Sequence, residues 1–465
     1  MLRKIRIAAA AFFFVLTTLL FLDFTGTLHA WFGWMAKIQF LPALLALNVG
    51  VVAFLVILTL LFGRVYCSVI CPLGVMQDIV SWASGKRRKH RNRFAYSPAL
   101  TWLRRGMLVV FVAAMLAGVG SLLAPYSAYG RIASNLLAPV YAWGNNLLAY
   151  IAGRMDSYAF YSVDVWMKSL STLLVAVVTF AVLFVLAWRS GRTYCNTICP
   201  VGTVLGFLAR YSLFKPRFDT SKCNGCKLCA RNCKASCIDP AAHKIDYSRC
   251  VACMDCLENC RQGAITYTLR RRKPDPAPAP QRPAADAAKT PSDASRRRFL
   301  GLAGIVAYSA LRAQEKKVDG GLAVIVDKKI PNRATPVVPP GAQSLRLFNA
   351  HCTGCQLCVS VCPNQVLRPS GKLMTLMQPE MSFERGYCRP ECTKCAEVCP
   401  TGAIRLTDLA GKSSIQIGHA VWIAENCVVN TDGVSCNNCA RHCPAGAIKM
   451  VRGTPTTPSR RASPP

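Results

Sequence analysis

Most cysteines of this chain fall into short, closely spaced groups, and this feature restricts the fold more than any other. Twenty of the 25 cysteines form five sets of four, and three of these sets share the run C-x2-C-x2-C-x3-C. The regular sets are Cys223, Cys226, Cys229 and Cys233; Cys250, Cys253, Cys256 and Cys260; and Cys352, Cys355, Cys358 and Cys362. The looser sets are Cys388, Cys392, Cys395 and Cys399, and Cys427, Cys436, Cys439 and Cys443. Such crowding favours metal clusters over disulfides, which need separated partners, and over zinc, which usually takes two distant C-x2-C pairs.

The regular run is the spacing with which bacterial ferredoxins hold [4Fe-4S] clusters, and its fourth cysteine ligates the cluster of the other run. We therefore predict two crossed ligand sets in the first two runs. These sets are Cys223, Cys226, Cys229 and Cys260, and Cys250, Cys253, Cys256 and Cys233. Cys237 remains an alternative to Cys233, because the usual proline is missing after both Cys233 and Cys260.

The last three sets predict three more clusters, about five in all. Their pairing stays open, because three runs cannot exchange in simple pairs and Cys427 lies far ahead of Cys436. A Gly-Ala-Ile sequence follows the last cysteine of three sets, starting at Gly263, Gly402 and Gly446. These residues predict the short strand that covers a ferredoxin cluster.

The rest of the chain is too apolar for a ferredoxin alone, since 52% of its 465 residues are hydrophobic. A membrane span needs about 20 apolar residues to cross roughly 30 Å of hydrocarbon. Four stretches are candidates, namely Ile7 to Leu22, Phe40 to Phe62, Met107 to Leu123, and Ser169 to Trp188. The first is a little short, but flanking residues can extend it. We therefore predict a multi-domain protein with a four-helix transmembrane unit (1–214) and two α+β bacterial-ferredoxin-like [4Fe-4S] domains (215–273 and 340–452).

Basic residues indicate how the spans are oriented, because lysine and arginine collect in cytoplasmic loops. They occur at Arg3, Lys4 and Arg6, in Lys86 to Arg93, and at Arg104 and Arg105. This pattern predicts a bacterial inner-membrane protein whose N-terminus is cytoplasmic. It also accounts for the net charge of +34 without nucleic acid. His29, Trp31 and Trp34 border the outer side of the first span, where interface anchoring explains them better than a quinol contact.

Four further cysteines belong to a sequence motif that occurs twice. The motif R-x-Y-C-x2-I-C-P-x-G runs from Arg64 to Gly74 and again from Arg192 to Gly202. Each copy follows a predicted outward-to-inward span, so the two copies should face one another at the cytoplasmic surface. Residues four apart share a helix face, so Cys67, Cys71, Cys195 and Cys199 could offer four thiolates to one metal or iron-sulfur site. Reduced structural thiols or a dithiol redox pair are the alternatives.

The four spans, the two C-x3-C-P motifs and the ferredoxin runs together resemble the NapH family of membrane polyferredoxins, which includes the C-terminal part of NosR. This resemblance covers residues 1–272 and implies oxidation of membrane quinol, with electrons delivered to a partner reductase. It also implies a relay role for the four motif cysteines. Residues 340–452 resemble the NapG and MauM family of periplasmic ferredoxins, so the chain looks like a NapH-NapG fusion. Those relatives are expected to carry four clusters, whereas this domain has cysteines for three.

Between the two ferredoxin domains lies a segment with two distinct parts. Residues 274–294 are rich in proline and alanine and predict an extended spacer. Residues 295–313 resemble a twin-arginine export signal with Arg296 and Arg297 as the pair, which predicts that the C-terminal domain is periplasmic. The alternative is a basic interfacial helix that keeps this domain cytoplasmic. Residues 453–465 predict a disordered tail.

The predicted function is that of a membrane conduit, which oxidises quinol and passes electrons through its clusters to a terminal reductase or cytochrome. No substrate-converting residue is visible in the sequence. One alternative is an accessory metal reductase or maturation factor whose C-x3-C-P cysteines handle copper or iron. Another is a cytoplasmic electron hub, which requires an inert Arg296-Arg297 signal. If the C-terminal domain is exported, about 30 Å of hydrocarbon separates the two ferredoxin domains, and the sequence leaves the electron route between them open.

Overall fold

The computed structural model describes residues 1–23, 26–86, 94–117, 123–165, 168–269, 335–384 and 386–417, together with 422, 424, 427–443 and 446–450. These residues form two compact units, Met1–Ile417 and Gly418–Pro465. The predicted spacer (274–294), the twin-arginine-like segment (295–313), the tail (453–465) and nearly all of the basic loop from Lys86 to Arg93 lie outside the described residues.

Two of the described helices are long and apolar enough to cross a membrane, α1 (Leu2–Leu22) and α11 (Leu170–Ser190). The predicted second span is not a single helix. It divides into α4 (Phe40–Leu45) and α5 (Val49–Phe62), because Leu47 takes a left-handed backbone (φ 53°) and the Asn48 side chain caps a new helix. The predicted third span corresponds to α8 (Thr101–Leu116). A unit of four transmembrane helices is therefore not confirmed.

Each copy of the duplicated motif folds into a short helix, a turn and a second helix. The first copy forms α6 (Val65–Val69) and α7 (Pro72–Gly85), and the second forms α12 (Thr193–Thr197) and α13 (Pro200–Ala209). The proline after the second cysteine starts the second helix, a position that does not require its missing N–H. The expectation that both cysteines of a pair lie on one continuous helix face is therefore wrong.

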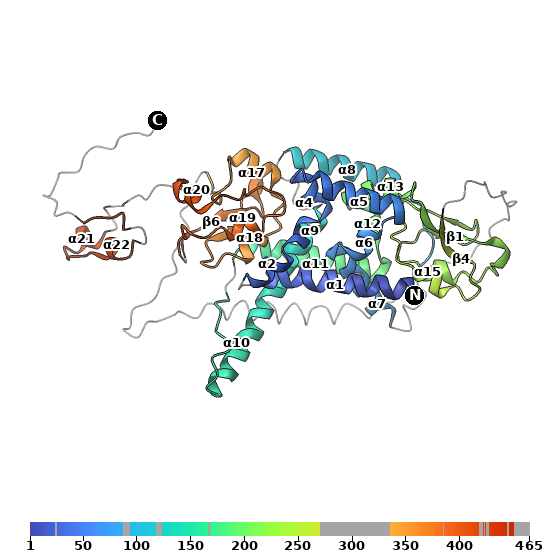
Figure 1. Cartoon of the computed structure of the whole chain (residues 1–465), viewed down its shortest axis with the longest axis horizontal. Coiled ribbons are helices and arrows are strands. Elements are labelled where there is room, and N and C mark those ends of the chain that lie inside the picture. The colour runs from blue at the N-terminus through green and yellow to red at the C-terminus, as the bar shows by residue number, and fades with distance from the viewer. Residues whose placement is uncertain are drawn as a thin grey trace, which may run out of the picture. The chain divides into compact units, whose positions relative to one another are not determined.

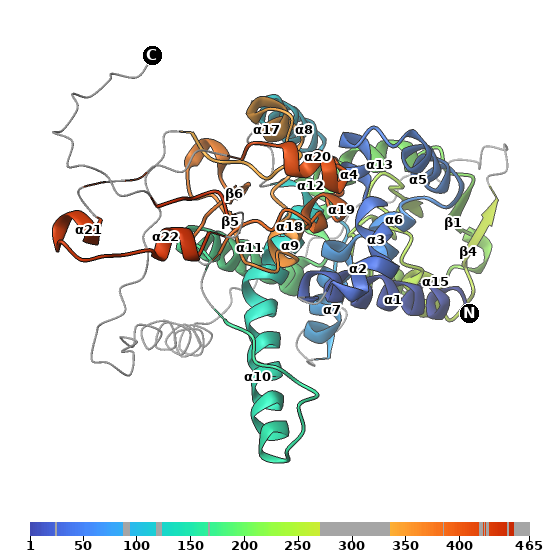
Figure 2. The same cartoon turned by 60° about the vertical axis from the view of Figure 1, so that its left-hand side comes forward.

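Short helices and one long helical segment connect the apolar helices. The chain between α1 and α4 forms α2 (Thr27–Phe32) and α3 (Trp34–Lys37). After α8 come α9 (Pro125–Ile132), a π-helical turn η3 (Ala133–Leu137) and α10 (Ala138–Arg154). All eight residues of α9 are buried, whereas no residue of α10 is. Figures 1 and 2 show α10 projecting from the body of the first unit, across the direction of α1.

The N-terminal ferredoxin-type region (214–269) consists of short strands and single-turn helices. In chain order these are β1 (Phe214–Phe218), the 3-10 turn η4 (Thr220–Lys222), α14 (Leu228–Arg231), β2 (Ile238–Asp239), β3 (Lys244–Ile245), α15 (Asp255–Asn259) and β4 (Ile265–Leu269). Strand β1 pairs antiparallel with β4, and β2 pairs with β3. The strand predicted after Gly263 is confirmed, because β4 begins at Ile265.

The C-terminal ferredoxin-type region (335–417) belongs to the same unit. It contains α17 (Leu345–His351), α18 (Leu357–Ser360), β5 (Leu367–Pro369), the 3-10 turn η5 (Leu373–Thr375), β6 (Pro379–Met381), α19 (Lys394–Glu397) and α20 (Leu409–Ser414). Strands β5 and β6 pair antiparallel. The strands predicted at Ile404 and Ile448 are absent from the described structure. The second unit contains α21 (Val428–Thr431) and α22 (Asn438–Arg441).

The two ferredoxin-type regions contact opposite ends of the apolar helices (Figure 1). At the start of α1, Arg3 forms ion pairs with Asp255 and Glu258 of the N-terminal region. Near the start of α11, the Lys168 carbonyl accepts hydrogen bonds from Arg368 of the C-terminal region. The duplicated motif therefore belongs to a body that contacts one ferredoxin-type region at each end.

Candidate metal centres

The three regular cysteine runs share one backbone shape. The residue before the second cysteine is left-handed in each run, at Gly225, Ala252 and Gly354, with φ between 50° and 71°. The residue after the second cysteine is left-handed as well, at Lys227, Met254 and Gln356. Because most residues avoid this conformation, its recurrence at six positions marks a constrained loop that turns the chain around a centre. Neither looser set repeats this pair of left-handed positions.

The first cavity in the N-terminal region is lined by cysteines of both runs. These are Cys223, Cys226, Cys229 and Cys260, together with Phe218 and Ile265 from the flanking strands. The structure thus brings together the first predicted ligand set, including the cysteine that crosses over from the second run. The mixture of four thiols with apolar neighbours suits a [4Fe-4S] cluster.

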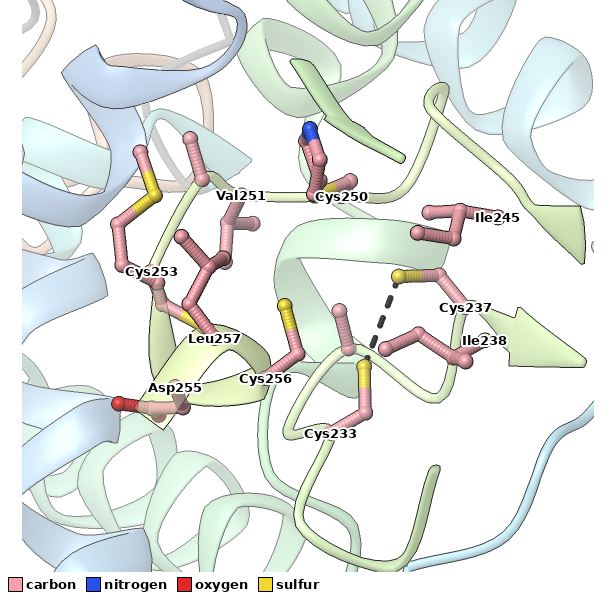
Figure 3. A pocket seen from close by; sticks show the side chains of 14 residues that line it. Cys233, Cys237, Ile238, Ile245, Cys250, Val251, Cys253, Asp255, Cys256 and Leu257 are labelled. Atoms are coloured by element: carbon pink, nitrogen blue, oxygen red, sulfur yellow. Dashed lines mark hydrogen bonds between the residues drawn. The ribbon is translucent and has the colours of Figure 1, made fainter. Parts of the chain in front are cut away.

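The second cavity is lined by five cysteines rather than four, namely Cys233, Cys237, Cys250, Cys253 and Cys256 (Figure 3). The sulfur atoms of Cys233 and Cys237 are 3.6 Å apart. A cubane has four iron corners, so one thiol is in excess.

Comparison with the neighbouring repeat distinguishes Cys233 from Cys237. Three residues after Cys260, Gly263 is left-handed with φ 62°, and Ala264 and Ile265 follow it. Three residues after Cys233, Ser236 is left-handed with φ 50°, followed by Cys237 and Ile238. Cys237 therefore occupies the position of an alanine, and Cys233 occupies the position of the regular fourth cysteine.

The third and fourth sets lie close together in the C-terminal region. The neighbouring thiols of Cys352 include those of Cys355 and Cys399, and burial together with these neighbours raises the pKa of Cys352. Burial and the neighbouring thiols of Cys388, Cys362 and Cys392 together raise the pKa of Cys395 to about 12. These contacts suit two crossed sets, which the sequence left open. They are Cys352, Cys355, Cys358 and Cys399, and Cys388, Cys392, Cys395 and Cys362.

The fifth set lies in the second unit. Cys427 immediately precedes α21, and Cys439 lies within α22. Because the unit boundary follows Ile417, this set is separate from the crossed pair of sets three and four.

The duplicated motif forms a second kind of cysteine site, inside the body of the first unit. Its four cysteines, Cys67, Cys71, Cys195 and Cys199, are only 4–5% exposed. The two copies contact each other through arginines that cross between them. Arg64 donates to the Cys195 carbonyl at 3.1 Å, and Arg192 donates to the Cys67 carbonyl at 2.6 Å. The motif copies therefore face one another, as the duplication predicts.

Polar side chains also approach the sulfur atoms of this site. The Arg64 guanidinium lies 3.8 Å from the Cys67 sulfur, and the Gln77 amide nitrogen lies 3.4 Å from the Cys195 sulfur. Among all described residues, no three His, Cys, Asp or Glu side chains lie close enough to hold a single metal ion. The two facing copies together supply four thiols, the number of cysteines that hold a [4Fe-4S] cluster.

The charges around the motif also suit a thiolate cluster. Arg64 and Arg192 are completely buried. Arg192 is paired with Asp78 at 2.8 Å, whereas the partners of Arg64 are amide and carbonyl oxygens and a sulfur. Burying an isolated cation is costly, so Arg64 calls for an anionic neighbour. Deprotonated cysteines around iron would supply that negative charge.

Asp78 connects the first copy of the motif to its surroundings. Its carboxylate pairs with Arg192, with Arg6 of α1 at 2.9 Å and with Lys234 of the N-terminal ferredoxin-type region at 3.7 Å. Burial alone would raise the pKa of Asp78, but Arg192, Lys234 and Arg6 outweigh it and hold this pKa well below its usual range. Asp78 is therefore ionised at neutral pH and joins three parts of the chain.

The motif contacts the N-terminal region through Arg64. Its guanidinium donates to the Ser248 carbonyl at 3.2 Å, two residues before Cys250. Arg104 of α8 donates to the same carbonyl at 3.2 Å. Gly206 of α13 also lies against it, and a Cβ atom there would overlap the Ser248 oxygen. The loop that leads into Cys250 is thus seated directly on the second copy of the motif.

The motif approaches the C-terminal region through α9. Gly130 lies so close to the Cys355 carbonyl that a Cβ atom would overlap it. The next residue, Arg131, is completely buried, and burial lowers its pKa to about 10 against the opposing effects of Tyr194 and Cys355. Because Tyr194 adjoins Cys195, the charge of Arg131 is close enough to interact with both the motif and the loop of the third cysteine run.

Sequence reasoning missed Arg64, Arg192, Asp78 and Arg131. Arg64 and Arg192 could have been noticed, because each is the first residue of a motif copy and lies next to an apolar stretch. Asp78 and Arg131 had no comparable signal, because their partners are distant in sequence.

Segments that contain both kinds of cysteine site match models of 4Fe-4S domains. A 4Fe-4S binding domain matches residues 44–90 and 172–221, which contain the two motif copies, and a 4Fe-4S dicluster domain matches residues 351–403. The ferredoxin-type protein NapH of Escherichia coli (strain K12) is 29% identical over 195 residues, covering 42% of this chain and 55% of that protein.

Two methylamine utilization ferredoxin-type proteins are also similar. MauN of Paracoccus denitrificans (strain Pd 1222) is 28% identical over 172 residues, covering 37% of this chain and 48% of MauN. MauM of Methylophilus methylotrophus is 33% identical over 123 residues, covering 24% of this chain and 50% of MauM. The chain thus spans about half the length of each relative, and no solved structure matches it. It is an iron-sulfur electron-transfer protein, related to the ferredoxin-type 4Fe-4S proteins NapH, MauN and MauM.

Proposed function

We propose that this chain is a membrane-bound conduit that oxidises quinol and passes electrons between its two ferredoxin-type regions through the buried motif. The observation that carries the proposal is the position of the motif between the two regions. Arg64 contacts both Cys67 and the loop before Cys250. On the other side, Gly130 lies against the Cys355 carbonyl, and the charge of the adjacent Arg131 interacts with Tyr194 and Cys355. Such contacts support a continuous route across the first unit.

The residues around the motif support an iron-sulfur cluster held by Cys67, Cys71, Cys195 and Cys199. When bound, such a cluster accepts and releases single electrons. The chain's part is to bury the site, to place Arg64 and Arg192 beside the thiolates and so to favour the more negative, reduced state. Oxidation of one quinol to quinone releases two electrons and two protons. Two one-electron acceptors would be needed to take up the electrons, and the protons would leave to water.

The arrangement of the two regions supports a transmembrane orientation. In this orientation the N-terminal region, next to basic Arg3 and Arg6, is cytoplasmic, and the C-terminal region at the other end of α1 is periplasmic. The twin-arginine-like segment before the C-terminal region agrees with its export. Electrons would then leave through the C-terminal clusters to a periplasmic reductase or cytochrome, in keeping with the similarity to NapH and MauM.

The accessory role in metal reduction is supported less well by the same site. A copper or iron cation would approach thiols that are enclosed in the core and flanked by the cations Arg64 and Arg192. A cationic substrate is repelled there, whereas an anionic resident cluster is stabilised.

The test uses the full chain, purified anaerobically in detergent and mixed with a reduced menaquinone analogue. We expect the visible iron-sulfur absorbance to bleach toward the level reached with dithionite. Bleaching with dithionite but not with quinol would overturn quinol oxidation. Tight, stoichiometric copper binding that is lost in the Cys67→Ala/Cys195→Ala variant, without quinol reactivity, would favour the accessory role instead.

A further inference from the structure

Helix α10 carries an apolar stripe that the other described residues leave exposed. The stripe consists of Val140, Trp143, Leu147 and Ile151, each 47–63% exposed. These residues are spaced by three or four positions and therefore share one helix face. Large exposed apolar surfaces of this kind mark interaction sites.

The opposite face of α10 is covered by the segment that returns to α11. Asn145 donates to the Tyr161 carbonyl at 2.8 Å, and Asn146 exchanges two hydrogen bonds of 2.8 Å with the Val163 backbone. The helix and the returning segment thus form one arm, residues 138–165, whose free face is the apolar stripe. In the described part of the chain, the asparagines hold the returning segment on the side of α10 that faces away from the stripe.

Three observations point to a lipid surface as the occupant of the stripe. The first is direction, since α10 runs across α1 in both views (Figures 1 and 2). If α1 crosses the bilayer, α10 extends along its surface, and its 17 residues reach about 25 Å.

The second observation is the position at which the arm leaves the apolar helices. The arm begins directly after η3, where Asn135 accepts a hydrogen bond from Thr172, near the first residues of α11. Asn135 also donates to Gln356 of the C-terminal ferredoxin-type region at 2.9 Å. The arm therefore leaves the body at the end of the apolar helices, beneath the C-terminal region, where lipid headgroups would lie.

The third observation is composition. The apolar helix α5 has neither tyrosine nor tryptophan, whereas the arm has Tyr141, Trp143, Tyr150, Tyr158 and Tyr161. Aromatic residues with a polar tip concentrate at the boundary between hydrocarbon and headgroups. Arg154, at the tip, lies over the Tyr150 ring and donates to its hydroxyl at 2.7 Å, within reach of lipid phosphates.

We infer that the arm lies flat on the outer membrane surface, with Trp143 and Leu147 inserted among the phospholipids below the C-terminal ferredoxin-type region. It would hold that region's electron-delivering face at a fixed height above the bilayer. The inference rests on the proposed membrane orientation but not on quinol oxidation.

The test reconstitutes the full chain in liposomes containing phospholipids with brominated acyl chains, which quench nearby tryptophan fluorescence. Subtracting the spectrum of Trp143→Phe from that of the wild type isolates the Trp143 signal. We expect brominated lipid to remove most of this difference signal. The Leu147→Glu/Ile151→Glu variant should no longer be quenched by brominated lipid. The control Ser162→Glu, at an exposed residue of the returning segment, should still be quenched.

A Trp143 signal that ignores brominated lipid would overturn the inference. So would a detergent-purified dimer that becomes monomeric in Leu147→Glu/Ile151→Glu, since the stripe would then bind a second copy. The quinol assay in detergent separates this result from the proposed function. Bleaching without quenching overturns only the inference, and quenching without bleaching overturns only quinol oxidation.

Discussion

The two copies of the cysteine motif begin alike and then diverge. Both fold as a short helix, a Cys-Pro turn and a second helix, and in both an opening arginine reaches across to the other copy. After the shared motif, the first copy continues with Gln77 and Asp78, whereas the second has Leu205 and Gly206 at the matching positions. The shared residues build the thiol site, and the divergent residues select its neighbours.

The divergence gives each copy a different contact with the N-terminal ferredoxin-type region. Asp78 attracts Lys234 through charge, whereas Gly206 admits the Ser248 carbonyl through space. A symmetric pair of helices thereby holds an asymmetric domain. Three variants test this comparison, and a fourth test makes the same kind of comparison between the ferredoxin repeats. They follow from the largest expected effect to the smallest.

Removing one thiol from each copy should have the largest effect. In Cys67→Ala/Cys195→Ala, only two of the four thiols remain, so we expect the motif to lose its iron and electron transfer across it to stop. Iron content per chain and quinol-dependent bleaching measure the two losses. Ser221→Ala, an exposed change in the N-terminal region, is the control, and unchanged iron and bleaching in the double variant would refute a shared site.

Neutralising Asp78 should be the next largest change. Asp78→Asn leaves Arg192 buried without its ion partner, and breaking such a pair costs about 3–5 kcal/mol. Because the pKa of Asp78 is lowered in the fold, its stabilisation is present at neutral pH and is lost only in acid, as pH falls below about 4. Thermal unfolding at pH 7 measures the cost, with the exposed Asp156→Asn as the control. Equal melting temperatures for the two variants would contradict the role of Asp78.

Filling the space at Gly206 should have a moderate effect on the second copy. The Cβ atom of Gly206→Ala would overlap the Ser248 carbonyl, and overpacking of this kind costs about 1–3 kcal/mol. We also expect the displaced loop to shift the reduction potential of the cluster at Cys250. Gly85→Ala, near the end of the matching helix of the first copy, meets open space and is the control. A redox titration that gives the same potentials for both variants would show that the loop is not seated on α13.

The smallest effect is expected where the ferredoxin repeats differ. Cys237 stands in the position of Ala264, so Cys237→Ala should keep the cluster, with a stability change below about 1 kcal/mol. Cys233→Ala should lose it. The electron paramagnetic resonance of the reduced clusters distinguishes the two, and the reverse pattern would make Cys237 the ligand.

The sequence predicts some of these features well and others poorly, for physical reasons. The crossed sets of the first two runs follow from spacing, because the left-handed turns within each run are local. The crossing of Cys362 and Cys399 depends on how two loops pack, which spacing does not encode. The break at Leu47 was hidden inside a continuous apolar stretch, although Asn48 is a good helix start. Helix α10 escaped prediction because its tyrosines and asparagines interrupt the apolar run that identifies a span.

The central claim is that electrons pass between the two ferredoxin-type regions through the motif. Its most direct test is freeze-quenched electron paramagnetic resonance of the full chain and of Cys67→Ala/Cys195→Ala after mixing with reduced quinone, with Cys355→Ala identifying the C-terminal signal. The account predicts that the wild type reduces clusters in both regions, while the double variant never reduces both. Reduction of both regions at wild-type rates in the double variant would contradict it.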